Sequence, residues 1–285
     1  VAVDGGGGVY LAGYFDAEAQ FGALGSRTPA GAADAFVLGL DGSNGAPKWV
    51  QTFGATRDDT ANAIAAHGKR VVAVGNFLDA LTIGGLTAKS YGSDDLFAVC
   101  FDLAGNPQWL WTFGGIDSDG ANAVAATPDG GWVIGGSYRD SIDLGGVTLK
   151  SKGATDALLV KLDGDGKIQW LKSFGGRNKD TILHVAVDAN GNIYVQGLFG
   201  DTADFGGKPL TAAGNADVVL AKYDRNGDHL WSQGFGNTFN DVAGGLAVDP
   251  AGDVTMVGSF ENKGPISFAP GDSHASLGEA DVYIA

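Results

Sequence analysis

The chain has one cysteine and no apolar run long enough to form a membrane-spanning helix. Cys100 stands alone among 285 residues, which excludes a disulfide framework and a metal site built from thiolates. Because it lies within the apolar segment 96–101, we interpret it as a small buried hydrophobic residue. A membrane helix needs about 18 or more consecutive apolar residues. No such run occurs, so we expect no membrane insertion.

Positive charge is also scarce. Lysine and arginine total 18 against 33 aspartate and glutamate residues, which gives a formal net charge of −15. A protein of this sign repels a phosphate backbone, so we expect no nucleic-acid partner. The sequence begins with valine and has neither a signal peptide nor an Asn-x-Ser/Thr acceptor. We therefore interpret it as an excised or processed segment of a longer product, with a bacterial source favoured.

Internal repetition is what the sequence has in abundance. Five glycines inside apolar runs follow one another at 62, 61, 61 and 61 residues: Gly13, Gly75, Gly136, Gly197 and Gly258. Other markers keep nearly the same period, namely Asp34, Asp95, Asp156, Asp217 and Asp281, the tryptophans Trp49, Trp109, Trp170 and Trp231, and the Phe-Gly pairs at 53, 113, 174 and 235. Recurrence of several markers at one period predicts a tandem-repeat fold.

Each repeat is predicted to contain four short strands. The first is dominated by Ala and Gly (61–66, 121–126, 182–187 and 243–248), the second is rich in Val, Ile and Tyr, the third follows the repeated Asp, and the fourth carries Trp. Short runs of this kind bounded by Gly, Asn and Asp are typical of strands. Turns such as 188–192 and 163–167 suit tight hairpins with one residue at positive φ.

A four-stranded antiparallel repeat of about 60 residues is typical of a β-propeller blade. Blades converge on an axis, so the small-residue strand is expected innermost and the Trp strand outermost. The sequence thus predicts one all-β domain of five blades, at approximately 1–56, 57–116, 117–177, 178–238 and 239–285. The fifth blade lacks its outer strand, so either residues outside this segment complete it or the ring has more blades than this segment contains. We predict an edge from Val282 to Ala285 that dimerises or takes a strand from outside this segment.

The pattern Ala-Val-Asp-x-x-Gly-Asn, then Asp-Phe-Gly-Gly, then Trp-x-x-x-Phe-Gly resembles the bacterial β-propeller repeat family labelled SBBP. The resemblance covers nearly the whole chain and is best over residues 183–236. Lys161 and Lys222 keep the lysine of that family, whereas Gly39 and Val99 depart from it. The resemblance implies a secreted, cell-surface or periplasmic bacterial protein and prescribes no catalytic residues. A weaker likeness to quinoprotein propeller repeats, at 163–170, lacks the adjacent cysteine pair.

The candidate site residues are predicted on the face where the connections before the first and third strands emerge. This face collects the long connections 78–93, 139–154, 200–215 and 261–279. Aspartates that recur in every blade usually satisfy backbone N–H groups, with a cation-binding carboxylate ring as the alternative. Residues with a specific function are instead expected at positions where the repeats differ. Arg57, Arg177 and Lys179 are among these. The candidate ligand-binding set is Asp59, Asp119, Asp180, Asp241, Asn62, Asn122 and His184.

From these features we expect a non-enzymatic binding or scaffold module that takes a carbohydrate or protein ligand on the loop-rich face. The alternative is a hydrolase or lyase that uses two carboxylates on a sugar at the mouth of the central channel. No metal site and no cofactor are predicted. The Asp-rich turns resemble fragments of calcium loops but lack the acidic residue at position 12. Hairpin chemistry is therefore favoured, and calcium stays open as the alternative.

Overall fold

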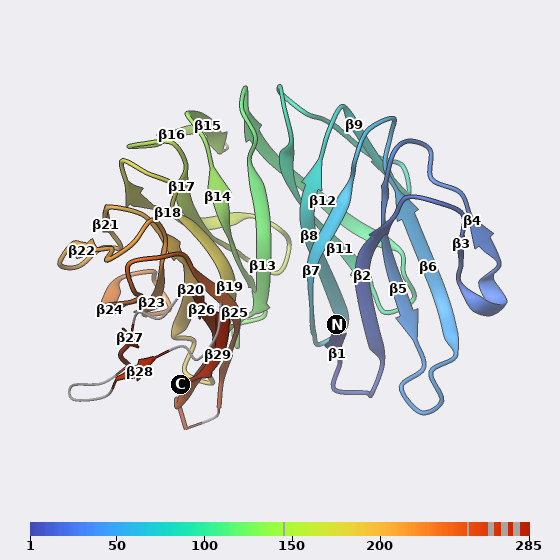
Figure 1. The fold of residues 1–285 in the computed structure, drawn as a ribbon. Coiled ribbons are helices and arrows are strands. Elements are labelled where there is room, and N and C mark those ends of the chain that lie inside the picture. The colour runs from blue at the N-terminus through green and yellow to red at the C-terminus, as the bar shows by residue number, and fades with distance from the viewer. Residues whose placement is uncertain (145, 250, 262–264, 269–272, 276–279) are drawn as a thin grey trace.

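The computed structural model describes residues 1–144, 146–249, 251–261, 265–268, 273–275 and 280–285. Five antiparallel sheets are arranged in a ring as the blades of a β-propeller (Figure 1). One short 3-10 turn, Gly22–Leu24, is the only helix in these residues, and no described helix is long and apolar enough to cross a membrane. The predicted all-β fold with five blades is confirmed.

Strands within a blade run from the axis outward in chain order. Blade 1 contains β1 (Ala2–Val3), β2 (Val9–Phe15), β5 (Asp34–Leu40) and β6 (Pro47–Phe53). Blade 2 contains β7 (Thr60–His67), β8 (Arg70–Phe77), β11 (Asp95–Asp102) and β12 (Pro107–Gly115). Blade 3 contains β13 (Gly120–Ala126), β14 (Trp132–Tyr138), β17 (Asp156–Leu162) and β18 (Ile168–Gly176). Blade 4 contains β19 (Thr181–Val187), β20 (Ile193–Phe199), β23 (Asp217–Tyr223) and β24 (His229–Phe235). Blade 5 contains β25 (Asp241–Val248), β26 (Val254–Glu261) and β29 (Ala280–Ile284).

The gradient from small to large residues is found as predicted. The Ala- and Gly-rich strands β7, β13, β19 and β25 contact one another in succession. The repeated tryptophans lie on the outer strands β6, β12, β18 and β24. Within the described residues blade 5 has three strands, because no outer strand follows β29.

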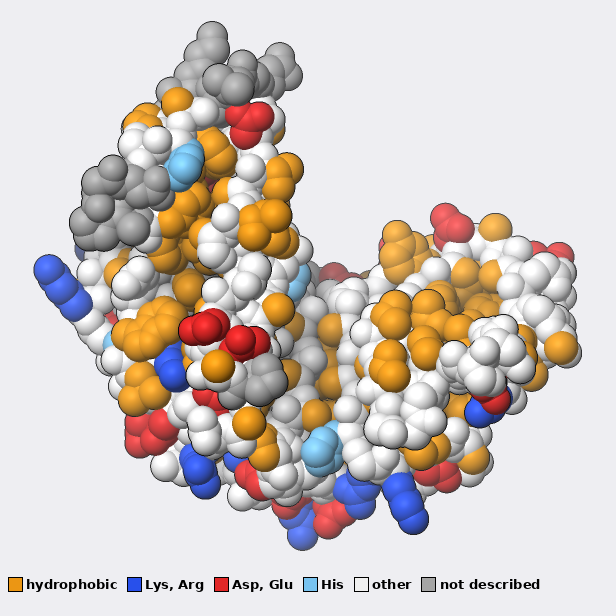
Figure 2. All heavy atoms as spheres, turned by 90° about the horizontal axis from the view of Figure 1, so that it is seen from below, with side chains coloured by type: hydrophobic (Ala, Val, Ile, Leu, Met, Phe, Trp, Pro, Cys, Tyr) orange, Lys and Arg blue, Asp and Glu red, His pale blue; other side chains and the backbone are white. Residues whose placement is uncertain are grey.

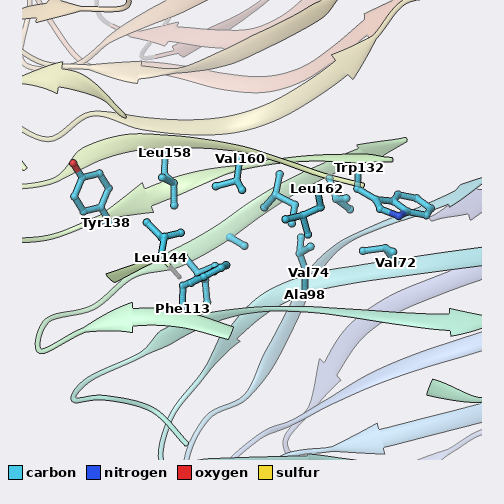
Figure 3. Close-up of a cluster of buried hydrophobic side chains, with 14 of the residues drawn as sticks. Val72, Val74, Ala98, Phe113, Trp132, Tyr138, Leu144, Leu158, Val160 and Leu162 are labelled. Carbon is cyan, nitrogen blue, oxygen red and sulfur yellow. The ribbon is translucent and has the colours of Figure 1, made fainter. Parts of the chain in front are cut away.

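The hydrophobic core lies between neighbouring blades. Figure 3 shows the cluster between blades 2 and 3, which includes Val72 and Val74 of β8, Trp132 of β14 and Leu158 of β17. Cys100 belongs to this cluster, and burial raises the pKa of its thiol to about 12. It is therefore a neutral packing residue, as the sequence predicted.

The repeated tryptophans connect the outer strands of successive blades. Trp49 Nε1 donates a hydrogen bond of 3.0 Å to the carbonyl oxygen of Leu103, in the turn before the fourth strand of the next blade. Trp109 and Trp170 do the same to Gly164 and Arg225, at 3.2 and 3.3 Å. Each indole also packs against a turn glycine with positive φ, in the space that a Cβ atom on that residue would need. These glycines are Gly105, Gly166 and Gly227. Trp and Gly thus recur together because they contact each other across neighbouring blades.

The four connections that we predicted as long loops contain short hairpins, and so does the connection between β2 and β5. These hairpins are β3 (Ala19–Gln20) with β4 (Ser26–Arg27), β9 (Ala80–Ile83) with β10 (Leu86–Lys89), β15 (Ser141–Leu144) with β16 (Val147–Lys150), β21 (Thr202–Asp204) with β22 (Leu210–Thr211), and β27 (Pro265–Ile266) with β28 (His274–Ala275). β15 pairs with Gly114 and Gly115 of the preceding blade, and β21 pairs with Gly175 and Gly176. Glycines without side chains allow this close approach of backbones. Parts of the connection 261–279 lie outside the described residues.

Candidate functional site

The predicted aspartates before the first strand are held inside the protein by backbone groups. Asp59 Oδ2 accepts the N–H of Ala55 at 2.8 Å, and its Oδ1 accepts the N–H of Leu78 at 3.2 Å. Asp119 and Asp180 repeat this arrangement, and Asp241 Oδ2 accepts the N–H of Asn237 at 3.0 Å. All four side chains are buried. Each therefore ties the start of an inner strand to the end of the preceding blade, and three of them tie it to their own blade as well. A ligand role for them stays a prediction.

A second buried aspartate lies beside each of these. A Cβ on Gly54 would lie 2.7 Å from Asp34 Oδ1 and 2.8 Å from Asp59 Oδ2, so the glycine leaves room for both carboxyl groups. The other pairs are Asp95 with Asp119, Asp156 with Asp180, and Asp217 with Asp241. Burial, with a smaller contribution from its neighbour, raises the pKa of Asp95 to about 7. Burial likewise raises the pKa of Asp59, Asp119, Asp180 and Asp241 to about 6.

The residues that differ between inner strands contact the next blade. Asn62 Nδ2 donates to the carbonyl oxygen of Ala121 at 3.0 Å, and Asn122 Nδ2 donates to that of Ile182 at 2.9 Å. His184 hydrogen bonds to the backbone of Ala243, while burial lowers the pKa of its imidazole. The structure thus gives all three a partner in the following blade, and a ligand role for them also stays a prediction.

The lysine shared with the SBBP pattern also has partners within the protein. Lys161 Nζ lies 2.6 Å from Asp129 Oδ2, and this ion pair helps lower the pKa of Asp129 to about 2 against the effect of burial. Lys222 Nζ lies 4.7 Å from the centre of the Tyr194 ring, a cation–π arrangement. Among the other charged residues that differ between copies, Arg57 lies 3.9 Å from Asp79 in an exposed ion pair.

A cleft lies elsewhere, at the rim between blades 2 and 3. It has a volume of about 840 Å³. Trp111 of β12 lies half-buried in its wall, and Tyr91 and Ile116 line it with side chains that are 74% and 80% exposed. Ser141, Asp143 and Thr148 of the β15–β16 hairpin supply hydroxyl and carboxylate groups. The cleft opens on the face that the sequence predicted to carry a site, because the connections before the first and third strands border it.

Three apolar residues of the cleft, Trp111, Tyr91 and Ile116, are found in one repeat only. At the position of Trp111 the other blades have Gln51, Lys172 and Gln233. At that of Tyr91 they have Ala30, Lys152 and Ala213, and at that of Ile116 they have Thr56, Arg177 and Thr238. A requirement common to all blades cannot explain residues that occur in one. The sequence reasoning missed this set, although a position-by-position comparison of the copies marks it.

A buried aspartate pair, Asp95 of blade 2 and Asp119 of blade 3, positions the cleft. Asp95 Oδ2 accepts the N–H of Tyr91 at 2.8 Å, and Asp119 Oδ2 accepts the N–H of Gly115, next to Ile116, at 2.7 Å. The two connections are joined to each other, since Ser93 N–H donates to the carbonyl oxygen of Ile116 at 3.1 Å. Tyr91 and Ile116 are therefore exposed side chains on an anchored backbone, as pre-organised ligand sites require.

Comparison with known proteins gives distant relatives, and no family model matches the chain. The chain is 29% identical over 128 residues to an uncharacterised WD repeat-containing protein of Acanthamoeba polyphaga mimivirus, covering 37% of this chain and 9% of that protein. It is 29% identical over 180 residues to regulatory protein FlaEY of Caulobacter vibrioides, covering 60% of this chain and 18% of that protein. The chain thus spans less than a fifth of either relative.

Solved structures with a similar course of the chain are equally remote. A protein of unknown function from Bacteroides caccae is 10% identical and covers 78% of this chain and 61% of its own, with a TM-score of 0.43. A calcium-binding regucalcin from Agrobacterium tumefaciens is 12% identical, covers 90% and 86%, and has a TM-score of 0.28. A europium-containing methanol dehydrogenase is 11% identical, covers 83% and 71%, and has a TM-score of 0.27. No function is assigned to this chain from these structures.

Proposed function

We propose that this propeller is a non-enzymatic binding module that holds a carbohydrate in the cleft between blades 2 and 3. The observation that supports this most directly is the aromatic and apolar set Trp111, Tyr91 and Ile116, which replaces polar or small residues of the other repeats in one place only. Exposed apolar side chains gathered on an anchored surface mark interaction sites.

A sugar suits the cleft better than an aliphatic peptide side chain. The aromatic rings offer apolar faces against which the C–H groups of a sugar ring can pack. Ser141, Asp143 and Thr148 stand beside them and would lose water without gaining partners under an aliphatic group, which is unfavourable. Sugar hydroxyls would both donate to Asp143 and bond to the neighbouring hydroxyls.

The alternative, a carboxylate-dependent hydrolase or lyase at the channel mouth, has less support. The repeated aspartates are buried and accept backbone N–H groups. None of them lines the cleft of Trp111. We further propose that the module belongs with the SBBP-type repeats and acts outside the cytoplasm of a bacterium, on the strength of the sequence resemblance. A protein ligand in the same cleft is the second alternative, and calcium in the Asp-rich turns is the third.

The test is glycan-array screening of the intact chain, followed by calorimetry on the best oligosaccharide. Trp111→Gln is the matched variant, because Gln51 and Gln233 show that the repeat accepts glutamine there. We expect it to weaken binding at least about tenfold, a loss of about 1.4 kcal/mol, while the melting temperature stays close to that of the parent.

Lys172→Gln, the same position in blade 3, serves as the control and should leave affinity unchanged. Equal affinity of parent and Trp111→Gln would place the ligand elsewhere. Binding of peptides, and not glycans, that depended on Trp111 would show that the ligand class is wrong. Release of reducing ends from a bound glycan would favour the enzyme.

A further inference from the structure

Three positively charged side chains gather at the boundary between blades 3 and 4. Lys152 lies in the connection before β17, and Arg177 and Lys179 lie in the connection between β18 and β19, so they share the face of the long connections. All three are exposed, and segments 151–155 and 176–179 contain no acidic residue. On the opposite face, seen from below in Figure 2, Lys and Arg side chains are scattered and several lie beside Asp or Glu. A chain with 18 basic and 33 acidic residues thus concentrates positive charge in one place.

The two segments hold each other through their backbones. The N–H of Ala154 donates to the carbonyl oxygen of Arg177 at 3.2 Å, and Thr155 forms a parallel bridge with Lys179. A Cβ on Gly153 would lie 2.2 Å from the carbonyl oxygen of Arg177, so this close approach requires a glycine. The positive side chains therefore project from one anchored surface.

Two of the three cations border one groove. Lys152 and Arg177 have the repeat positions of Tyr91 and Ile116, and both of those residues line the cleft between blades 2 and 3. The same place one blade further along the chain therefore has positive charge where the cleft has apolar surface.

The buried aspartates do not require these cations. Lys152 lowers the pKa of the neighbouring Asp156 and Asp180, against the larger effect of burial. The boundary between blades 4 and 5 has the same kind of buried pair, Asp217 with Asp241. At the positions of the three cations that boundary has only neutral residues, namely Ala213, Thr238 and Asn240. A need common to the blades therefore does not explain the positive charge.

None of the three cations forms an ion pair with a residue that the structure describes. At the boundary between blades 1 and 2 the exposed cation has such a partner, since Arg57 lies 3.9 Å from Asp79. Asp201 is the repeat equivalent of Asp79, but the neutral Asn178 stands at the position of Arg57. The three cations are thus available to an anion from outside the protein.

We propose that Lys152, Arg177 and Lys179 bind an acidic polysaccharide through its carboxylate groups. An exposed ion pair contributes only about 0–1 kcal/mol. A chain that carries several acidic groups can engage the three cations together and gains more than a single small anion does. The site lies one blade boundary away from the Trp111 cleft and does not depend on the carbohydrate proposed there.

The surroundings of the cations favour a polysaccharide over the other polyanions. Thr155 and Asn178 offer hydroxyl and amide groups to sugar hydroxyls, and the segments 151–155 and 176–179 contain no large apolar residue that could hold a peptide side chain. Duplex DNA carries one charge per about 1.7 Å of its length, so the net charge of −15 opposes its approach strongly. A polyuronate carries a single charge on each sugar and is opposed less.

The experiment measures binding of the intact chain to immobilised polygalacturonate, with the fully methyl-esterified polymer as the neutral reference. We expect retention on the acidic form only, and weaker binding at about 0.15 M than at about 0.01 M ionic strength, because salt screens exposed charges. The triple variant Lys152→Ala, Arg177→Thr, Lys179→Asn carries the residues of the next boundary. It should keep the melting temperature of the parent and lose at least about tenfold in affinity.

A second triple variant, Lys69→Gln, Lys89→Gln, Lys167→Gln, is the charge-matched control. Its three lysines are exposed, form no described ion pair and lie outside segments 151–155 and 176–179. Each triple variant removes three positive charges and changes the net charge from −15 to −18, so the control should bind nearly as the parent does.

Equal losses in the two triple variants, or equal retention of the parent on the acidic and the esterified polymer, would overturn the proposal. A loss of the same size in Trp111→Gln would overturn it as well, because the ligand would then lie in the cleft. Tighter binding of the parent to polyglutamate or duplex DNA than to polygalacturonate would show that the ligand class is wrong.

Discussion

At the scale of single residues, the paired aspartates couple stability to pH. Asp95 and Asp119 are buried together, with pKa values raised to about 7 and about 6, whereas an unfolded chain releases these protons near pH 4. Between pH 4 and 7 the folded state therefore binds more protons than the unfolded state. The linkage relation then requires the free energy of unfolding to fall as pH rises through this window.

The two members of this pair should respond differently to amide substitution. Asp95 Oδ1 has no hydrogen-bond partner among the described residues, and its Oδ2 accepts one N–H. Asp95→Asn keeps that acceptor and removes a buried charge, so we expect greater stability at pH 8 and a shallower fall between pH 4 and 7. Urea denaturation across this range measures both.

Asp119→Asn is the contrasting variant. Both oxygens of Asp119 accept backbone N–H groups, from Gly115 and Arg139, and an amide can replace only one of them. We expect a loss of about 1–3 kcal/mol at pH 5. Equal effects of the two substitutions, or stability that rises from pH 4 to 7, would contradict this account of the pair.

Residue patterns predicted the structural aspartates better than the candidate site. A carboxylate recurring at the start of the inner strands of blades 2 to 5 indicated a need common to these blades, and the backbone bonds of Asp59 and Asp180 meet that expectation. Trp111 was missed because it lies two residues after the repeated Trp109, within an aromatic segment typical of an outer strand. Its distinction is its departure from Gln51, Lys172 and Gln233, which periodicity does not reveal.

At the scale of elements, the outer strands are connected through tryptophan and the turn of the next blade. Trp170→Phe keeps an aromatic ring but removes the hydrogen bond to Arg225 and much of the cover over Gly227. We expect a loss of about 1–3 kcal/mol in the free energy of unfolding. Trp231→Phe is the matched control, because no described turn accepts a hydrogen bond from Trp231, and it should cost less. Equal losses in denaturant melts would exclude the turn contact as the reason for the repeat.

The exposed edge of β29 carries a separate prediction. Its other side pairs with β26, and the N–H groups of Val282 and Ile284 point away from that partner by the alternation of an antiparallel ladder. A peptide with the sequence of the outer strand of blade 4, 225–236, should therefore add beside β29. Hydrogen exchange should show protection of Val282 and Ile284 at peptide excess, and Val282→Pro should abolish it. Unchanged exchange at saturating peptide would contradict strand addition.

Strand content and order followed from the sequence, but the shape of the connections did not. The small-residue strands lie innermost and the Trp strands outermost, as predicted. Blades that converge on an axis leave room only for small side chains near it, so composition alone predicts the position of each strand. The hairpins within 139–154 and 200–215 depend on Gly115 and Gly176 of the preceding blade. Such long-range pairing has no local sequence signal, so these segments resembled loops.

At the scale of the whole molecule, two opposing forces act on any association of copies. The exposed apolar side chains of Val3, Val282 and Ile284 favour contact between copies, whereas the net charge of −15 makes copies repel each other. The apolar contribution was not evident from the sequence, because Leu38 and Ile284 are equivalent to core residues of other repeats. Only the arrangement of the blades shows that no other described residue covers them completely.

Salt should therefore strengthen association of the intact chain. Screening shortens the reach of like-charge repulsion from about 30 Å at 0.01 M to about 8 Å at 0.15 M ionic strength, while apolar attraction is not weakened. We expect sedimentation to show more assembly at the higher ionic strength, and carbohydrate binding at Trp111 to change little, since a neutral sugar carries no charge to screen. Assembly that dissolved on adding salt would instead show that ion pairs hold the copies together, because only attraction between opposite charges weakens under screening.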